Sequence, residues 1–279
     1  MKNIITLKNK EINLNELHVM GILNITPDSF YDGGKNSGQE TILKKVQTMI
    51  DHGATFVDIG GYSSRPGADY VSEEEELSRV IPVIQLLNTK FPDIVISIDT
   101  FRSTVAKQAI QAGASIINDI SAGNMDEKMF TTVADLQVPY IIMHMQGTPQ
   151  TMQDNPSYEN ICEEELQFFT EKINKLQKLG VKNIIIDPGF GFGKTVEHNY
   201  ELLNNLQIFQ KFGLPILVGF SRKSMINKVI NTTPEQALNG TTVLNTLALT
   251  KGAKILRVHD VKEAKEVILL YKKMISQKN

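Results

Sequence analysis

Eight short apolar segments recur along the chain, and each is followed by a longer segment with helical periodicity. The short segments are rich in Ile, Val, Leu and Met with little alternation, which is typical of strands buried on both faces. They cover residues 18–24, 55–59, 94–99, 115–119, 139–144, 183–187, 215–220 and 253–258. The helical patterns cover residues 39–52, 73–89, 102–112, 126–136, 158–179, 196–211, 235–250 and 260–274. Eight strand–helix units predict an α/β fold of the (β/α)8 TIM-barrel type.

The alternative arrangement is an open, doubly wound sheet. It is disfavoured because no G-x-G-x-x-G fingerprint follows the first strand. Residues 1–16 predict a short hairpin ahead of the first barrel strand, and we expect it to close the bottom of the barrel. No linker, low-complexity run or shift in composition divides the sequence, so we expect one domain over residues 1–279.

Composition excludes several classes of protein. The formal net charge of −2 gives no basic surface for a polyanion, so we expect no nucleic-acid partner. The single Cys162 excludes disulfides within the chain and fits a reduced, cytoplasmic setting. No window approaches eighteen uninterrupted apolar residues, and residues 1–14 lack a continuous apolar run, so we expect neither a membrane span nor a signal peptide.

Nearly every predicted strand ends in a residue that can bind or ionise. These residues are Asn24, Asp58, Asp99, Asn118, Asp119, His144, Asp187, Ser221, Arg257 and His259. In a parallel barrel the carboxyl ends of the strands converge on one face, where the following loops build the active site. Polar residues commonly end strands for structural reasons alone, but such a complete set on otherwise apolar strands favours a functional site.

Asp99, Asn118 and Asp187 follow the apolar runs most closely, so we expect them near the barrel interior. A buried carboxylate must find hydrogen-bond donors or shift its pKa. Two carboxylates and an amide around one cavity suit a flat heterocycle with several N–H donors. Lys223, just after the seventh strand, can cover the acceptor side of such a ring. An Asp-Pro turn remains the structural alternative for Asp187.

A second group of residues suits an anion. Arg65, Arg257, His259 and Asn24 all lie on the predicted catalytic face. Cations and an amide around loop backbone N–H groups are typical of a phosphate or diphosphate site. A Mg²⁺ ion at Asn24 fits, because Mg²⁺ takes few protein oxygen ligands and completes its shell with phosphate and water. Surface salt bridges remain the alternative for the two arginines.

The segment GFGFGKT at 189–195 ends like a phosphate-binding P-loop. The first glycine of that motif would fall at Pro188, so its spacing rejects a P-loop. The sequence also contains no H-E-x-x-H, C-x-x-C or G-x-S-x-G motif, which leaves zinc hydrolases and serine esterases without support.

Eight ordered motifs at the strand ends resemble one family. They read MGILNITPDSFYDGG, DIGGYSSRPGA, ISIDTFR, IINDISAG, IIMHMQGTP, IIDPGFGFGK, GFSRKSMI and ILRVHDV. From Val19 onward the chain resembles the dihydropteroate synthases, the folate-pathway transferases that sulfonamides target. The resemblance implies a (β/α)8 barrel that condenses 6-hydroxymethyl-7,8-dihydropterin diphosphate with 4-aminobenzoate, assisted by Mg²⁺. The products would be 7,8-dihydropteroate and diphosphate, and the family implies a homodimer.

The resemblance also implies roles for individual residues. Pterin binding is implied for Asp99, Asn118, Met143, Asp187 and Lys223, and diphosphate binding for Asn24, Ser64, Arg65, Arg257 and His259, with Asn24 also at the metal. Aminobenzoate binding is implied for Phe30, Pro66, Phe192 and Lys223, with the carboxylate near Ser224. Catalytic roles fall to Asp99, Asp187, Lys223 and Asp32. Tyr31 and Ser64 depart from the residues that many relatives have, Ser and Thr.

The loop over residues 24–37 is long for a strand-to-helix connection in a compact barrel. Such loops are usually functional or disordered, and its place on the catalytic face favours a lid. We expect Phe30 and Asp32 to swing over the amine pocket and Gly33–Gly34 to supply the hinge.

Two other classes of function remain to be separated from this one. A corrinoid-dependent methyltransferase would share the barrel and the pterin site but would not need the anion group. A pterin-binding module without catalysis would keep the ring contacts alone. Neither would release diphosphate from the pterin substrate.

Overall fold

The structure is a computed structural model that describes residues 3–7, 10–25, 35–62 and 70–277. Eight parallel strands run in the order β8-β7-β6-β5-β4-β3-β10-β9. Their bounds are β3 His18–Asn24, β4 Phe56–Gly60, β5 Val95–Asp99, β6 Ile116–Asp119, β7 Tyr140–Met143, β8 Ile184–Asp187, β9 Leu217–Val218 and β10 Ile255–Val258. The N–H group of Ile186 donates to the carbonyl of Pro215 at 3.0 Å, and a bridge between Ile186 and Ile216 brings the ends of the sheet together. The prediction of a (β/α)8 barrel is confirmed.

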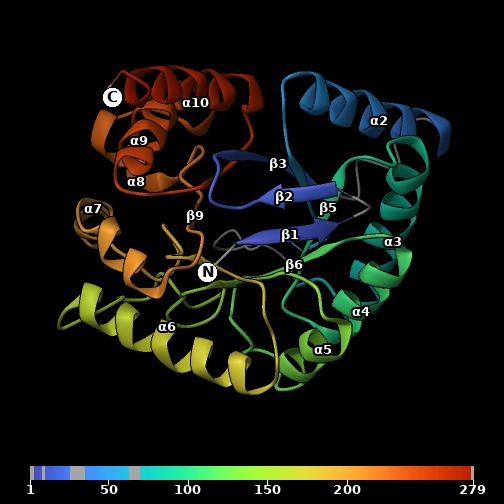
Figure 1. Cartoon of the computed structure of the whole chain (residues 1–279), viewed down its shortest axis with the longest axis horizontal. Coiled ribbons are helices and arrows are strands. Elements are labelled where there is room, and N and C mark those ends of the chain that lie inside the picture. Colours follow the sequence, from blue (N-terminus) through green and yellow to red (C-terminus); the bar gives the residue numbers. More distant parts are fainter. Residues whose placement is uncertain (1–2, 8–9, 26–34, 63–69, 278–279) are drawn as a thin grey trace.

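Helices surround this ring of strands, as Figure 1 shows. They are α2 Lys35–Asp51, α3 Glu73–Lys90, α4 Ser103–Ala112, α5 Met129–Leu136, α6 Ile161–Lys178, α7 Val196–Asn204, α8 Ser224–Ile230, α9 Leu238–Thr250 and α10 Val261–Ile275. Short 3₁₀ segments, η1 Leu206–Phe212 and η2 Pro234–Gln236, join some of them. The outward side chains of the strands pack against the helices in one large apolar core, which explains why the strands alternate so little between apolar and polar residues.

An antiparallel hairpin closes the amino-terminal end of the barrel. Its strands β1 Ile4–Leu7 and β2 Lys10–Asn13 lie across the middle of the ring of helices in Figure 1. Ile5, Ile12 and Leu14 pack against a layer of interior apolar side chains near the strand starts, such as Phe56 and Ile255. The predicted hairpin and its position at the barrel bottom are confirmed.

Two local predictions about helices were wrong. The helix predicted over 196–211 ends at Asn204, where the side chain of Asn205 donates to the carbonyl of Glu201 and the chain tightens into η1. The sequence analysis also missed α8, because its seven residues are too few to show a helical period. Among the described residues, no helix combines the length and apolarity needed to cross a bilayer.

Candidate active site

The polar site lies directly above the apolar layer of the barrel interior. Side chains two residues apart on a strand point the same way, so each interior apolar residue is followed two or four residues later by another interior side chain. By this rule the strands bring six polar residues into the upper barrel, namely Asn24, Asp58, Asp99, Asn118, Asp187 and Arg257. These six polar residues from different strands therefore share the carboxyl-terminal end of the barrel interior, and their roles in ligand binding stay predictions.

Arg257 forms the centre of a buried ionic network. Its Nε donates to Oδ2 of Asp58 at 2.6 Å, and its Nη2 donates to Oδ2 of Asp99, also at 2.6 Å. The amide of Asn118 donates to the same Oδ2 of Asp58 at 3.0 Å, while Oδ1 of Asp58 has no hydrogen-bond partner among the described residues. The arginine thus joins strands β4, β5 and β10, and both carboxylates orient it.

The electrostatics of this network follow from burial. Burial raises the pKa of Asp99 to about 7, although Arg257 pulls it down. Burial by itself lowers the pKa of Arg257, but Asp58 and Asp99 outweigh it and hold that pKa above its usual value. The site therefore holds the Arg257 cation directly beside the Asp99 carboxyl group.

Asp187 and Lys223 form a second pair of buried charged groups near Arg257. Oδ1 of Asp187 accepts the N–H group of Gly189 at 2.8 Å. The ammonium of Lys223 donates to the carbonyl of Phe190 and lies 4.5 Å from the centroid of the Phe192 ring. Burial raises the pKa of Asp187 against the pull of Lys223, and burial lowers the pKa of Lys223 to about 7. The Asp-Pro turn exists, but the Asp187 side chain also faces the site cations.

Gly219, directly after β9, lies between Lys223 and Arg257. A Cβ atom at Gly219 would lie 3.8 Å from Nζ of Lys223 and 3.9 Å from Cβ of Arg257. Lys223 and Arg257 therefore border one space, and Asp187 acts electrostatically on both. A ligand with a ring and an anionic group can contact both cations there.

The anion side of the mouth holds Asn24 and His259. A Cβ atom at Gly60 would lie 3.7 Å from Oδ1 of Asn24 and 3.8 Å from Oδ2 of Asp99, so these oxygens flank a bare stretch of backbone. Nδ1 of His259 lies 3.0 Å from Oγ of Ser221, which also accepts the His259 N–H group at 3.1 Å. The described residues contain no group of three His, Cys, Asp or Glu side chains suited to a metal. A cation here would rely on Asn24 and on ligand oxygens.

An apolar wall completes the mouth. Met143 is 3% exposed and packs in a cluster with Phe101, Ile120, Met145 and Met152. Phe192 and Tyr62 are half-buried beside this cluster. Methionine side chains are adaptable and make favourable contacts with aromatic rings, so this wall suits the face of a flat ligand.

Ser224 is the first residue of α8. It lines a cavity of about 350 Å³ together with Thr195, Asn199 and Lys228. Five predicted site residues, Phe30, Asp32, Ser64, Arg65 and Pro66, lie outside the described residues, as does Tyr31. The proposed lid at 24–37 falls largely outside them too.

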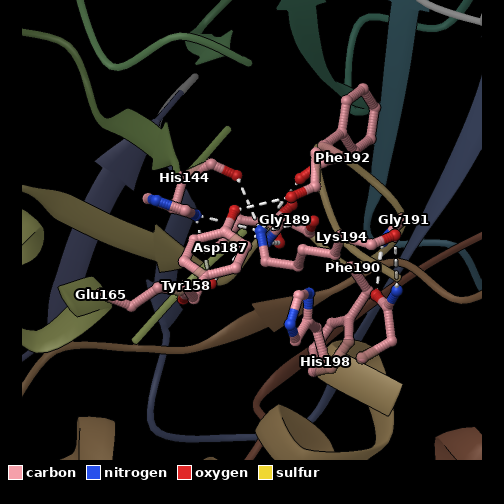
Figure 2. A network of polar contacts seen from close by, with 12 residues as sticks. His144, Tyr158, Glu165, Asp187, Gly189, Phe190, Gly191, Phe192, Lys194 and His198 are labelled. Atoms are coloured by element: carbon pink, nitrogen blue, oxygen red, sulfur yellow. Dashed lines mark hydrogen bonds and ion pairs between the residues drawn. The ribbon is translucent and has the colours of Figure 1, made fainter. Parts of the chain in front are cut away.

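Sequence reasoning assigned no role to Asp58, His144, Glu165 or Lys194. Figure 2 shows the last three in a buried network beside Asp187 and the glycine-rich segment. In the sequence, Asp58 and His144 stand out only as polar residues at strand ends, and Lys194 only within a segment that resembles a P-loop. The sequence signal for Lys194 is that a charged residue directly follows a glycine-rich segment after a predicted strand.

Comparison with known proteins gives a consistent result. Residues 20–259 match a family model described as pterin binding enzyme. Over 269 residues the chain is 44% identical to dihydropteroate synthase of Escherichia coli strain K12, covering 96% of this chain and 95% of that enzyme. It is 47% identical over 258 residues to dihydropteroate synthase of Clostridium beijerinckii, covering 91% and 93%.

Solved structures agree with the sequence relatives. A Yersinia pestis dihydropteroate synthase in complex with a sulfonamide drug has a TM-score of 0.91 at 41% identity and covers 98% of this chain and 99% of its own. A Xanthomonas albilineans dihydropteroate synthase with 4-aminobenzoic acid has a TM-score of 0.91 at 37% identity, and the match covers 99% of both chains.

Proposed function

This chain belongs to the pterin binding enzyme family and to its dihydropteroate synthases, and from that premise we propose which of its residues carry the reaction. The reaction condenses 6-hydroxymethyl-7,8-dihydropterin diphosphate with 4-aminobenzoate to give 7,8-dihydropteroate and diphosphate. The observation that carries the proposal is the continuous arrangement of Asp187, Lys223, Asp99 and Arg257 around one opening at the barrel mouth.

The pterin ring would occupy the deep part of this opening. Asp187, Asp99 and Asn118 offer oxygen acceptors for its N–H groups, while Lys223 donates to an acceptor on its edge. Met143 would lie against its face. In the free protein Asp99 pairs with Arg257 and Asn118 with Asp58, so the same groups are already oriented by one another before a ligand arrives.

The diphosphate would lie toward Arg257, His259 and Asn24. Two carboxylates orient the guanidinium of Arg257 and use two of its five N–H donors, so three donors remain for a bound anion. Mg²⁺ fits beside Asn24, whose exposed amide oxygen is a hard donor, with phosphate and water completing its shell. When bound, Mg²⁺ would neutralise part of the charge on the leaving diphosphate. Ser64 and Arg65 are proposed here from the family resemblance alone.

The chemistry would begin with cleavage of the bond between the methylene carbon and the diphosphate oxygen, and the electron pair leaves with the diphosphate. The dihydropterin ring shares the positive charge that develops on the methylene. Asp187 and Asp99 are fixed anions in a poorly solvated site, and such preorganised charges stabilise a developing cation better than water does. Burial raises the pKa of both carboxyl groups, but Arg257 beside Asp99, Lys223 beside Asp187 and the developing cation all favour the ionised forms.

The amine of 4-aminobenzoate would then form the new C–N bond and lose a proton to solvent or diphosphate. We propose that it binds near Phe192 and Lys223, with its carboxylate toward Ser224, and that Phe30 and Pro66 complete the pocket. Asp32 is proposed to reach the site from the lid. Positioning supplies most of the remaining acceleration because an aromatic amine is a weak nucleophile.

Diphosphate release tests this function directly. The purified protein with the pterin diphosphate, Mg²⁺ and 4-aminobenzoate should form dihydropteroate and diphosphate in equal amounts, separated by chromatography. Leaving out Mg²⁺ should lower the rate, and adding a sulfonamide should compete with 4-aminobenzoate. A corrinoid-dependent methyltransferase or a non-catalytic pterin binder would release no diphosphate, and that result would overturn the proposal.

We also propose that the protein is a homodimer through an apolar face on α8, α9 and α10. Among the described residues, most exposed large apolar side chains lie on these three helices, which are grouped together in Figure 1. Val243 and Leu247 on α9 and Leu269 and Leu270 on α10 are 43–73% exposed. Exposed large apolar side chains gathered on neighbouring helices are typical of an interface. The cytoplasmic setting inferred from the single Cys162 stays a prediction.

A further inference from the structure

The ammonium group of Lys194 is fully buried and surrounded by acceptors. Its side chain is 0% exposed, and Nζ lies 3.1 Å from the carbonyl oxygens of both Gly189 and Phe192. Nδ1 of His144 is 3.0 Å away and the His144 carbonyl 3.4 Å away. Figure 2 shows the lysine side chain reaching back into the segment that precedes it.

The charge of Lys194 is balanced by Glu165 on α6. Oε1 of Glu165 lies 3.2 Å from Nζ of Lys194 and 3.2 Å from Nδ1 of His144, and the glutamate side chain is 0% exposed. Neither carboxylate oxygen makes a well-directed hydrogen bond to any described residue. Glu165 therefore acts mainly as a counter-charge, whereas the directed contacts of the ammonium go to the loop and to His144.

The backbone of segment 189–193 bends repeatedly, and the buried ammonium of Lys194 provides hydrogen bonds that hold this conformation. Gly189, Gly191 and Gly193 have φ angles of +70°, +84° and +61°, a region that residues with a Cβ rarely adopt. A Cβ atom would lie 2.0 Å from the His144 carbonyl at Gly189 and 2.5 Å from the Gln146 carbonyl at Gly193. The glycines let the loop lie flat against the segment after β7, and Lys194 fills its centre.

This loop carries several contacts of the candidate active site. The Gly189 N–H group orients Asp187, the Phe190 carbonyl accepts from Lys223, and the Phe192 ring lies beside the Lys223 ammonium. Two of the residues whose carbonyls bind Lys194, Gly189 and Phe192, thus also contact the side chains of Asp187 and Lys223. A substitution of Lys194 would therefore alter the positions of Asp187 and Lys223 through Gly189 and Phe192, which contact both sides.

We propose that Lys194 is a positioning residue for the condensation: its buried ammonium fixes the loop 189–193 and so sets the places of Lys223 and Phe192 in the aminobenzoate pocket. This inference rests on the proposed function. Hydrogen-bond donors, and not only volume, are required, because an ammonium offers three donors to the converging acceptors of Gly189, Phe192 and His144 while a methionine offers none. Its charge also acts on the site, lowering the pKa of both Asp187 and Lys223.

Four variants separate positioning from simple stability. Lys194→Met removes the donors, Glu165→Gln removes the counter-charge, and the double variant removes both charges. The exposed Lys182→Met serves as the matched control. Each variant is measured for melting temperature, for KM of both substrates, and for hydrogen exchange of a peptide covering residues 188–195.

The expected results differ between the two roles. Lys194→Met and the double variant should raise the KM for 4-aminobenzoate by about tenfold or more, because small misplacements of positioning groups are costly. Loop exchange should accelerate in both, while the KM for the pterin changes less. The double variant should recover most of the melting temperature lost by Lys194→Met, since no unpaired charge stays buried. Glu165→Gln should lose stability but keep KM near that of the wild type.

A double variant that recovers both stability and KM would show that Lys194 is only structural and would overturn the proposal. The same conclusion follows if Glu165→Gln raises KM as much as Lys194→Met does. If Lys194→Met does not fold, the double variant and Glu165→Gln still decide. Failure of the proposed function is distinct, because the wild type would then form no dihydropteroate, while hydrogen exchange would still report whether Lys194 orders the loop.

Discussion

Replacement of Asp187 by Asn tests whether a fixed negative charge stabilises the proposed cation. Asp187 is 5% exposed and acts electrostatically on Lys223 and Arg257. At about 4 Å and an effective dielectric constant near 20, one carboxylate stabilises a unit positive charge by about 4 kcal/mol. Because about 1.4 kcal/mol corresponds to a factor of ten, the variant should lose about 10²- to 10³-fold in kcat, the lower value allowing for the dipole of the new amide.

The substitution is well matched to the structure. An Asn oxygen can still accept the Gly189 N–H group that Oδ1 of Asp187 accepts at 2.8 Å, so the turn should survive and the melting temperature should change little. Diphosphate release is measured with both substrates saturating, so that weaker pterin binding does not mask the chemical step. Asp135→Asn, at an exposed position of α5, is the control. A kcat for Asp187→Asn equal to that of the wild type would refute the cation-stabilising role.

Three further predictions follow from other parts of the structure. Phe192→Leu should raise the KM for 4-aminobenzoate more than the KM for the pterin, since the ring lies 4.5 Å from the Lys223 ammonium; equal effects in steady-state kinetics would contradict that placement. Burial lowers the pKa of Lys223 to about 7. Between about pH 7 and 10 the unfolded chain therefore holds a proton on Lys223 that the folded chain has lost. The contribution of this group to the free energy of unfolding then rises with pH. Urea unfolding of the unliganded protein should therefore show Lys223→Met more stable than the wild type at pH 6, with its advantage shrinking as the pH rises; a constant difference would contradict the shifted pKa. Leu270 is 73% exposed, so Leu270→Glu should convert the proposed dimer to a monomer in light scattering without destabilising the fold of the single chain. An unchanged molecular mass would place the interface elsewhere.

The architecture was predictable because the strands of this barrel are buried on both faces. Runs such as the one ending at Asp187 stay apolar until the residue that enters the site, so the strand and its functional end appear together in the sequence. The hairpin has two short strands whose buried residues, Ile5 and Ile12, lie opposite each other and cover the barrel end.

The ionic networks were not predictable from local pattern. Asp58, Asn118 and Arg257 meet only because the barrel closes, and their separations in sequence carry no sign of it. Lys194 in a polar, glycine-rich segment looks solvent-exposed, and its burial depends on Glu165 from the preceding helix. The sequence shows which side chains can carry charge, but their pairing depends on the tertiary structure.

The N-terminal hairpin closes one end of the barrel. Because Ile5, Ile12 and Leu14 fill the far opening with apolar side chains, the described structure offers substrates the carboxyl-terminal mouth as their entrance. The substrate that binds deeper in the barrel must enter first, and the second substrate then binds above it, nearer the mouth. We therefore expect an ordered mechanism in which the pterin substrate binds before the amine. A molecule bound in the outer position should prevent the inner one from dissociating until the outer one has left.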